Sequence, residues 1–202
     1  YLIEGGPTKS YNKTRGMLIS EPEIWNRLME KLADMSIEYL SMQARAGANA
    51  LQIFDSWVGA VNSTEYEQAI FPHMKRIIST VKSRFPNLPL AMNGVGTDHL
   101  VSTWAKLPLD VIALDWRSSL GAAKDRGVTQ TVQGNLDPAY LYGDTKTIAK
   151  VVDEILMDGV RHGKHVFNLG HGVFPEADPA KLHWLTDYVH EKSRELWARE
   201  SR

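Results

Sequence analysis

The sequence predicts an α/β protein that forms part of a (β/α)8 TIM-type barrel. Short apolar segments alternate with longer helical segments along the chain, which indicates parallel strands joined by helical crossovers. No G-x-G-x-x-G follows the first apolar segment, so a dinucleotide-binding fold lacks its fingerprint. A closed barrel needs eight strand–helix units and about 250 residues. The 202 residues hold about six units, so we expect one domain over residues 1–202 with the first units absent; an open doubly wound sheet is the alternative.

The N-terminal region is predicted to contain the end of a strand and one long helix. Leu2-Ile3 is expected to be the tail of a strand, so we expect the true start of the protein to lie upstream. A helix is predicted over 21–46, because Pro22 beside two carboxylates is typical of a helix start and Gly47 of a helix end. Apolar residues at spacings of three and four predict one buried face on this helix. They are Trp25, Leu28, Leu32, Met35, Tyr39 and Met42.

The rest of the chain continues the alternation of strands and helices. Apolar runs bounded by turn residues predict strands at 50–54, 88–92, 111–114, 128–132 and 165–169. Longer segments between them predict helices at 66–84, 99–106, 120–126, 145–158 and 180–197.

Composition and charge exclude several classes of function. The chain is 43% hydrophobic and 23% charged, which is typical of a globular protein. Its net charge of −1 provides no basic excess for nucleic acid or for an anionic membrane, so neither is an expected partner. The absence of cysteine excludes thiolate nucleophiles and cysteine-bound metals and fits a reducing compartment, so we expect a cytoplasmic protein. No apolar run approaches the roughly 20 residues that span a bilayer.

Polar residues follow each predicted strand at the point where it ends. In parallel strand–helix folds the functional sites lie at the carboxyl ends of the strands, so we expect these residues to line one mouth. Glycines among them let the backbone approach a large ligand closely. The segments are Glu4-Gly5-Gly6, Asp55-Ser56-Trp57, Asn93-Gly94, Asp115-Trp116, Gln133-Gly134-Asn135-Leu136-Asp137-Pro138 and Asn168-Leu169-Gly170-His171-Gly172.

All of these segments except Asn93-Gly94 resemble the signature segments of the uroporphyrinogen decarboxylase family, in the order in which that family has them. The resemblance runs from Tyr1 into the last predicted helix, and Tyr1-Leu2-Ile3-Glu4-Gly5-Gly6 is similar to the family's Tyr-x-x-Glu-Gly-Gly segment. It implies a (β/α)8 barrel with a deep cleft. The implied activity is the removal of CO2 from the four acetates of uroporphyrinogen, which gives coproporphyrinogen in porphyrin and haem biosynthesis. It further implies no metal or organic cofactor, and a homodimer with the two clefts facing each other.

The resemblance also implies site residues. Tyr1, Ser56 and His171 match the family's active-site tyrosine, serine and histidine, which contact substrate side chains. Asp55, Asp115 and Asn135 are further candidates for substrate binding, although tying strand ends together or capping a helix explains them equally well. The family's aspartate that faces the pyrrole nitrogens, and its carboxylate-binding basic residues, belong to a segment upstream of Tyr1.

Several residues have structural interpretations that compete with functional ones. Trp57 and Trp116 are typical walls of a barrel mouth, and Asp137 is a possible helix cap. For Glu4, the structural alternative to a substrate contact is an ion pair with a buried basic side chain. His162 and His165 have the spacing of a metal pair, but they lie at a helix-to-strand turn on the face opposite the mouth, so we expect no metal there.

Two other functions remain open. A corrinoid-linked methyltransferase of related fold activates thiols on zinc held by His and Cys, and a chain without cysteine fits it poorly. A non-catalytic or truncated remnant of the decarboxylase family would have exposed strand edges that need a partner. For a dimer, Trp104 and Trp184 are candidates for exposed contact residues.

Overall fold

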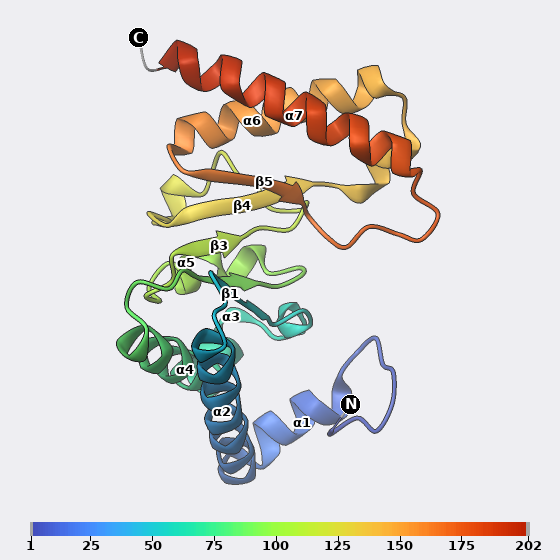
Figure 1. Cartoon of the computed structure of the whole chain (residues 1–202). Helices are drawn as coiled ribbons and strands as arrows, with labels where there is room; N and C mark the ends of the chain where they lie inside the picture. The colour runs from blue at the N-terminus through green and yellow to red at the C-terminus, as the bar shows by residue number, and fades with distance from the viewer. Residues whose placement is uncertain (1, 201–202) are drawn as a thin grey trace.

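The computed structural model describes residues 2–200, which form seven α-helices and five β-strands (Figure 1). In chain order the elements are α1 (Asn12–Ser20), α2 (Pro22–Arg45), β1 (Leu51–Phe54), α3 (Ser63–Ala69), α4 (Phe71–Arg84), β2 (Leu90–Asn93), α5 (Val101–Trp104), β3 (Val111–Ala113), β4 (Thr131–Leu136), α6 (Thr145–His162), β5 (His165–Leu169) and α7 (Pro179–Glu200). Short 3-10 helices lie at Val58–Ala60, Asp98–Leu100, Lys124–Arg126 and Pro138–Tyr142.

The five strands form one parallel sheet in the order β1-β2-β3-β4-β5. Each strand pairs with the next one along the chain, as in an arc of a (β/α) barrel. A doubly wound sheet reverses its strand order at a switch point. The sequential order therefore confirms the barrel-type α/β fold and rules out the doubly wound alternative. Within the described residues, β1 and β5 are the two edges of the arc.

The two faces of the sheet differ in burial. Directly paired residues of neighbouring strands point to the same face, because side chains alternate along each strand. Met92, Ile112 and Val132 share one row of the register and are fully buried, on the face that the helices cover. Phe54 and Val166 lie at the two ends of the next row and are 67% and 47% exposed. This second face corresponds to the inner wall of a barrel, and it is open at both edges.

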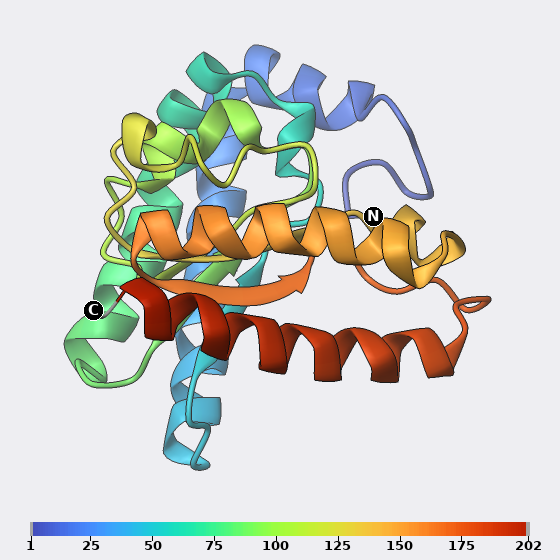
Figure 2. The ribbon, with the colours of Figure 1, turned by 90° about the horizontal axis from the view of Figure 1, so that it is seen from above.

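Helices cover the sheet at both ends of the arc. Figure 2 shows α6 and α7 running side by side, and Figure 1 places this pair beside β4 and β5. Around β1 and β2 the layer is formed by α2 and α4, and the larger buried core lies on this side. None of the helices in the described part of the chain is long and apolar enough to cross a membrane.

The predicted first strand is absent from the structure. Leu2 and Ile3 lie in turns, so five of the six predicted strands are present among the described residues. The carboxylate of Glu4 accepts hydrogen bonds from the backbone N–H and the hydroxyl of Thr14, both at 2.9 Å, in the first turn of α1. Glu4 thus satisfies donors at the start of a helix, and the predicted pairing with a buried base is not among its contacts.

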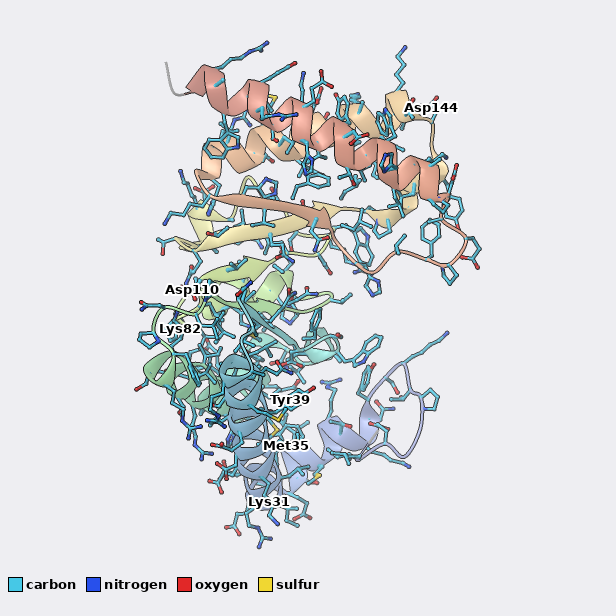
Figure 3. All side chains as sticks on the ribbon, in the orientation of Figure 1. Lys31, Met35, Tyr39, Lys82, Asp110 and Asp144 are labelled. Atoms are coloured by element: carbon cyan, nitrogen blue, oxygen red, sulfur yellow. The ribbon has the colours of Figure 1, made fainter. Side chains whose placement is uncertain are left out.

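The predicted buried face of α2 is only partly buried. Met35, Tyr39 and Met42 are 62%, 58% and 53% exposed, and Figure 3 shows Met35 and Tyr39 along α2. The helix buries a neighbouring stripe through Ile37 and Leu40 instead. The correction has a physical reason: α2 lies at the open edge of the sheet, so no strand or helix of the described residues covers its second apolar stripe.

Three further boundaries differ from those predicted. The helix expected at 66–84 is broken at Ile70, because Pro72 lacks the N–H that would continue the helix from the preceding turn. The helix expected at 120–126 is one 3-10 turn, which ends at Gly127 with φ +82°. The strand expected at 128–132 begins three residues later, at Thr131.

The tryptophans suggested as dimer contacts are not free surface residues. Trp104 is fully buried, and its indole N–H donates to the hydroxyl of Tyr66 at 2.9 Å. Trp184 is half-buried and stacks on Tyr188 with ring centres 5.2 Å apart. Both therefore belong to the packing within this chain, and the expectation that Trp104 is exposed was wrong.

Candidate active site

The carboxyl ends of the five strands meet at one edge of the sheet, because all the strands are parallel. The segments that leave this edge are 55–57, 94–97, 114–123, 137 and 170–178. The labelled residues of Figure 3 identify the two edges. Asp144 comes after β4, on the side of the carboxyl ends, whereas Lys82 and Asp110 come before β2 and β3, on the side of the amino ends. The structure therefore brings the predicted polar segments of β1 to β5 to one side of the molecule.

Asp55, Ser56 and Trp57 follow β1. The backbone N–H of Asp55 donates to the carbonyl of Asn93 at 2.8 Å, which joins the ends of β1 and β2. Burial raises the pKa of the Asp55 carboxyl to about 6. Ser56 is half-buried beside it, and Trp57 is 65% exposed with its ring centre 6.3 Å from that of Tyr11. This strand end thus presents a carboxyl group that takes up a proton near neutral pH.

A cavity of about 1040 Å³ opens beside this strand end, between α1, α2 and β1. Apolar side chains of α2 and β1, such as Tyr39 and Phe54, form much of its wall. Asp55 and Arg15 are polar groups in the lining, and the Arg15 guanidinium donates to the carboxylate of Glu65 at 3.0 Å. The cavity lies along the unpaired edge of β1, where a further strand of a closed barrel would lie.

Asp115 and Asn135 tie neighbouring strand ends together. Asp115 is fully buried, and its carboxylate accepts hydrogen bonds from the backbone N–H of Gly96 at 2.5 Å and of Arg117 at 3.0 Å. The side-chain amide of Asn135 donates to the backbone carbonyls of Asp115 and Ser118, at 3.0 and 2.7 Å. These bonds connect the loops after β2 and β3 with each other and with the last residues of β4. Both residues therefore have the structural role of tying strand ends together. A contact with the substrate stays a prediction for both of them.

His171 lies after β5 and meets the loop after β3. Its ring centre is 5.8 Å from that of Trp116, and the two rings are nearly perpendicular. The contact depends on Gly170, where a Cβ atom would lie 2.4 Å from the backbone nitrogen of Trp116. A small pocket of about 310 Å³ adjoins the exposed imidazole, and its lining includes Trp116, Tyr142 and Phe174.

Arg117 is a polar group of this edge that the sequence did not single out. Its guanidinium lies over the Trp116 ring, with Cζ 3.7 Å from the ring centre, and Nη1 donates to the buried carboxylate of Asp115 at 3.1 Å. The only signal in the sequence was its position directly after Asp115-Trp116 at a strand end.

The remaining predicted residues lie in other places. Tyr1 lies outside the described residues. Asp137 accepts a hydrogen bond from the backbone N–H of Ala139 at 2.9 Å, so the predicted helix cap is confirmed. Nε2 of His162 donates to the carbonyl of Gln130, and Nε2 of His165 to that of Gly134. Among the described residues, no group of three His, Asp or Glu side chains has a geometry that could hold a metal ion.

Comparison with known proteins identifies close relatives. A family model described as uroporphyrinogen decarboxylase matches residues 1–192. The uroporphyrinogen decarboxylase of Geobacillus sp. strain WCH70 is 52% identical over 191 residues, which cover 95% of this chain and 55% of that protein. The one of Bacillus subtilis strain 168 is 51% identical, covering 96% of this chain and 54% of that protein. The chain thus spans about half the length of the curated relatives it matches.

A solved structure of a methyltransferase from Methanosarcina mazei has the same fold. The TM-score is 0.75, and the match covers 93% of this chain and 54% of that one. The sequence identity is 16%, so this likeness concerns the fold alone.

Proposed function

Because this chain belongs to the uroporphyrinogen decarboxylase family, we propose that it functions in an enzyme that removes CO2 from the four acetates of uroporphyrinogen III. The product is coproporphyrinogen III, an intermediate of haem biosynthesis. The observation that carries the proposal is the family match over residues 1–192, which includes each polar segment at the carboxyl edge of the sheet. The enzyme is a carboxy-lyase that works without a cofactor.

The substrate itself supplies the electron sink for decarboxylation. Protonation of a pyrrole ring gives a cation, and CO2 then leaves from the acetate, with the electron pair of the broken C–C bond neutralising that cation. The exocyclic methylene that remains takes up a proton to become a methyl group, and the ring releases the proton that was added first. The protein has to orient the ring, stabilise the positive charge and bind the peripheral carboxylates. We assign the binding of the peripheral carboxylates to side chains of this chain. The charge that faces the pyrrole nitrogens comes from the part of the barrel that this chain does not span.

Four residues of this chain have proposed roles at the substrate. The Ser56 hydroxyl donates to a carboxylate of a substrate side chain, and so does the phenol of Tyr1. His171 binds a propionate through its exposed imidazole, whose ring N–H can donate to a carboxylate. Asp55 contacts the substrate from the carboxyl end of β1, and its raised pKa keeps part of its population neutral close to a substrate of high negative charge.

The partner and the location follow the family. We expect a homodimer in the cytoplasm, with the carboxyl edges of the two barrels facing each other. Tyr142 and Phe174 support this orientation: their rings stack at 4.5 Å beside that edge, and Tyr142 is 68% exposed.

A truncated, inactive form of the family is the second candidate, because one observation favours it. The open edge of β1 and the exposed stripe of Met35, Tyr39 and Met42 need a cover that the described residues do not provide. A corrinoid-linked methyltransferase is disfavoured, since the chain has no cysteine to hold the zinc on which such enzymes activate thiols.

The test is anaerobic incubation with uroporphyrinogen, followed by chromatography of the oxidised products according to their number of carboxyl groups. It compares the 202-residue chain with a version extended at the N-terminus to the length of its relatives. Products with seven to four carboxyl groups from the extended version support the proposal. Products from that version alone show that the 202-residue chain is the truncated form. If both return only the eight-carboxyl substrate, the proposal is wrong.

A further inference from the structure

We propose that Arg117 binds a peripheral carboxylate of the substrate, and that Asp115 and Trp116 hold its guanidinium in place for this purpose. The inference rests on the proposed function, because it takes the substrate to be a polycarboxylated tetrapyrrole. It assigns Arg117 as a binding residue and gives Asp115 the role of a positioning residue.

The distribution of cations at the carboxyl edge points to Arg117. Within the described residues, it is the one Lys or Arg in the segments that join each strand to the helix or 3-10 helix that follows it. A substrate that carries eight carboxylates needs cationic partners at this edge. The forked guanidinium is suited to them, because two of its parallel N–H groups match the two oxygens of a carboxylate.

The guanidinium is fixed before any ligand arrives. Its Nη1 is 3.1 Å from the Asp115 carboxylate, which is fully buried and also accepts two backbone N–H groups. Its Cζ lies 3.7 Å above the Trp116 ring, the arrangement of a cation–π contact. An arginine held on two sides loses less conformational entropy on binding than a free one.

The same guanidinium remains open to a ligand. The Arg117 side chain is 51% exposed, whereas that of Asp115 is 0% exposed. The ion pair engages one nitrogen of the guanidinium, so donors remain on the exposed part of the group.

Trp116 connects Arg117 to a second carboxylate-binding candidate. The guanidinium lies 3.7 Å from the centre of the Trp116 ring, and the imidazole of His171 lies 5.8 Å from it. A guanidinium and an imidazole beside one indole match a substrate whose acetates and propionates project from neighbouring positions of the same pyrrole. Arg117 and His171 together therefore form a two-point carboxylate site across the ends of β3 and β5.

The test measures KM and kcat for uroporphyrinogen in the full-length enzyme carrying Arg117→Met. We expect KM to rise about tenfold or more with a much smaller change in kcat, since the lost interaction is charge-assisted and is present in bound substrate and transition state alike. Arg161→Met is the matched control. Arg161 makes the same type of ion pair at the same distance, 3.1 Å to Asp158, at the end of α6 that leads into the opposite edge of the sheet. Its KM should not change.

The double variant Asp115→Asn/Arg117→Met separates substrate binding from a purely structural role. It removes the buried charge together with its partner, so it also carries the test if the Arg117→Met variant fails to fold. A KM that stays high in the double variant supports the proposal. A KM that returns to that of the unsubstituted enzyme overturns it, and so does an unchanged KM in Arg117→Met. An unsubstituted enzyme that does not decarboxylate uroporphyrinogen would instead overturn the proposed function.

Binding of oxidised porphyrins identifies which carboxylate Arg117 contacts. Uroporphyrin carries acetates and propionates, whereas coproporphyrin keeps only the propionates. If Arg117→Met weakens binding of both, the partner is a propionate; if it weakens uroporphyrin alone, the partner is an acetate. Unchanged affinity for both porphyrins would refute the proposal.

Discussion

Replacing Gly170 by alanine should separate the ends of β3 and β5. A Cβ at this position would lie 2.4 Å from the backbone nitrogen of Trp116, 2.9 Å from its Cβ and 3.0 Å from its Cα. Contacts of this kind are normally at about 3.4 Å or more, so the two backbones have to move apart by about 1 Å. Gly170 is held in this position, because its N–H donates to the carbonyl of Leu136 at 2.7 Å. Overpacking of this kind costs about 1–3 kcal/mol of unfolding free energy.

Gly172→Ala is the matched control, since a Cβ there meets nothing within 4 Å. Urea unfolding of the full-length enzyme should show the loss of about 1–3 kcal/mol for Gly170→Ala and at most about 0.5 kcal/mol for Gly172→Ala. The contact of His171 with Trp116 should also loosen, so under the proposed function KM for uroporphyrinogen should rise in Gly170→Ala. Equal stabilities of the two variants would show that the close approach of β5 to Trp116 is not as the structure has it.

Three further predictions concern buried polar groups. Burial raises the pKa of Asp55 to about 6, above its unfolded value, so its ionisation lowers stability as pH rises from about 4 to 6. Asp55→Asn should therefore gain stability relative to the parent across that window and hold the gain above it, which urea unfolding at several pH values measures. Tyr66→Phe leaves the buried indole N–H of Trp104 without its acceptor at 2.9 Å and should cost about 1–3 kcal/mol in urea unfolding. Lys82→Met removes a half-buried ammonium, 2.8 Å from the Asp110 carboxylate, and should lower the thermal unfolding midpoint at pH 7.

Each of these three has an outcome that would contradict it. A stability difference between Asp55→Asn and the parent that is flat from pH 4 to 7 would mean that the carboxyl is not desolvated. A Tyr66→Phe protein as stable as the parent would mean that Trp104 has another acceptor. For Lys82→Met, the effect should shrink when Asp110 is replaced by asparagine, and an unchanged deficit in that background would assign it to lost packing of the lysine stem.

The sheet was predictable from the sequence because its signals are local. The buried run around Ile112 and the run of β5 each stand between turn residues, so their positions were correct to within a residue or two. The start of β4 was misplaced for a reason that is not local. The side-chain amide of Gln130 donates to the carbonyls of Ala105 and Leu107, which holds the residues before β4 to the preceding turn. Hydrogen bonds between segments about 25 residues apart do not alter the pattern of apolar residues, so that pattern could not predict where β4 begins.

The sequence predicts which strand ends form the site, but it does not predict which side chains touch one another there. Parallel strands bring their carboxyl ends together whatever the details of packing, so His171 could be placed at the same edge as Ser56 and Asp115. The register and the close approach at Gly170 decide that His171 meets Trp116. Arg117 was missed because a charged residue in a loop usually faces solvent. Its fixed position depends on burial of Asp115, which no spacing reveals.

The carboxyl edge is held together by bonds within this chain even though the inner face of the sheet is open. The loop after β2 is bonded to Asp115, the loop after β3 to Asn135, and the end of β5 to Leu136. These ties run between neighbouring strands and need no contribution from across the barrel. The proposed carboxylate-binding groups can therefore be in place before the barrel closes, whereas Phe54 and Val166 at the two edges of the sheet remain exposed within the described residues. Under the proposed function, closing the barrel adds the charge that faces the pyrrole nitrogens to a wall whose geometry is already set.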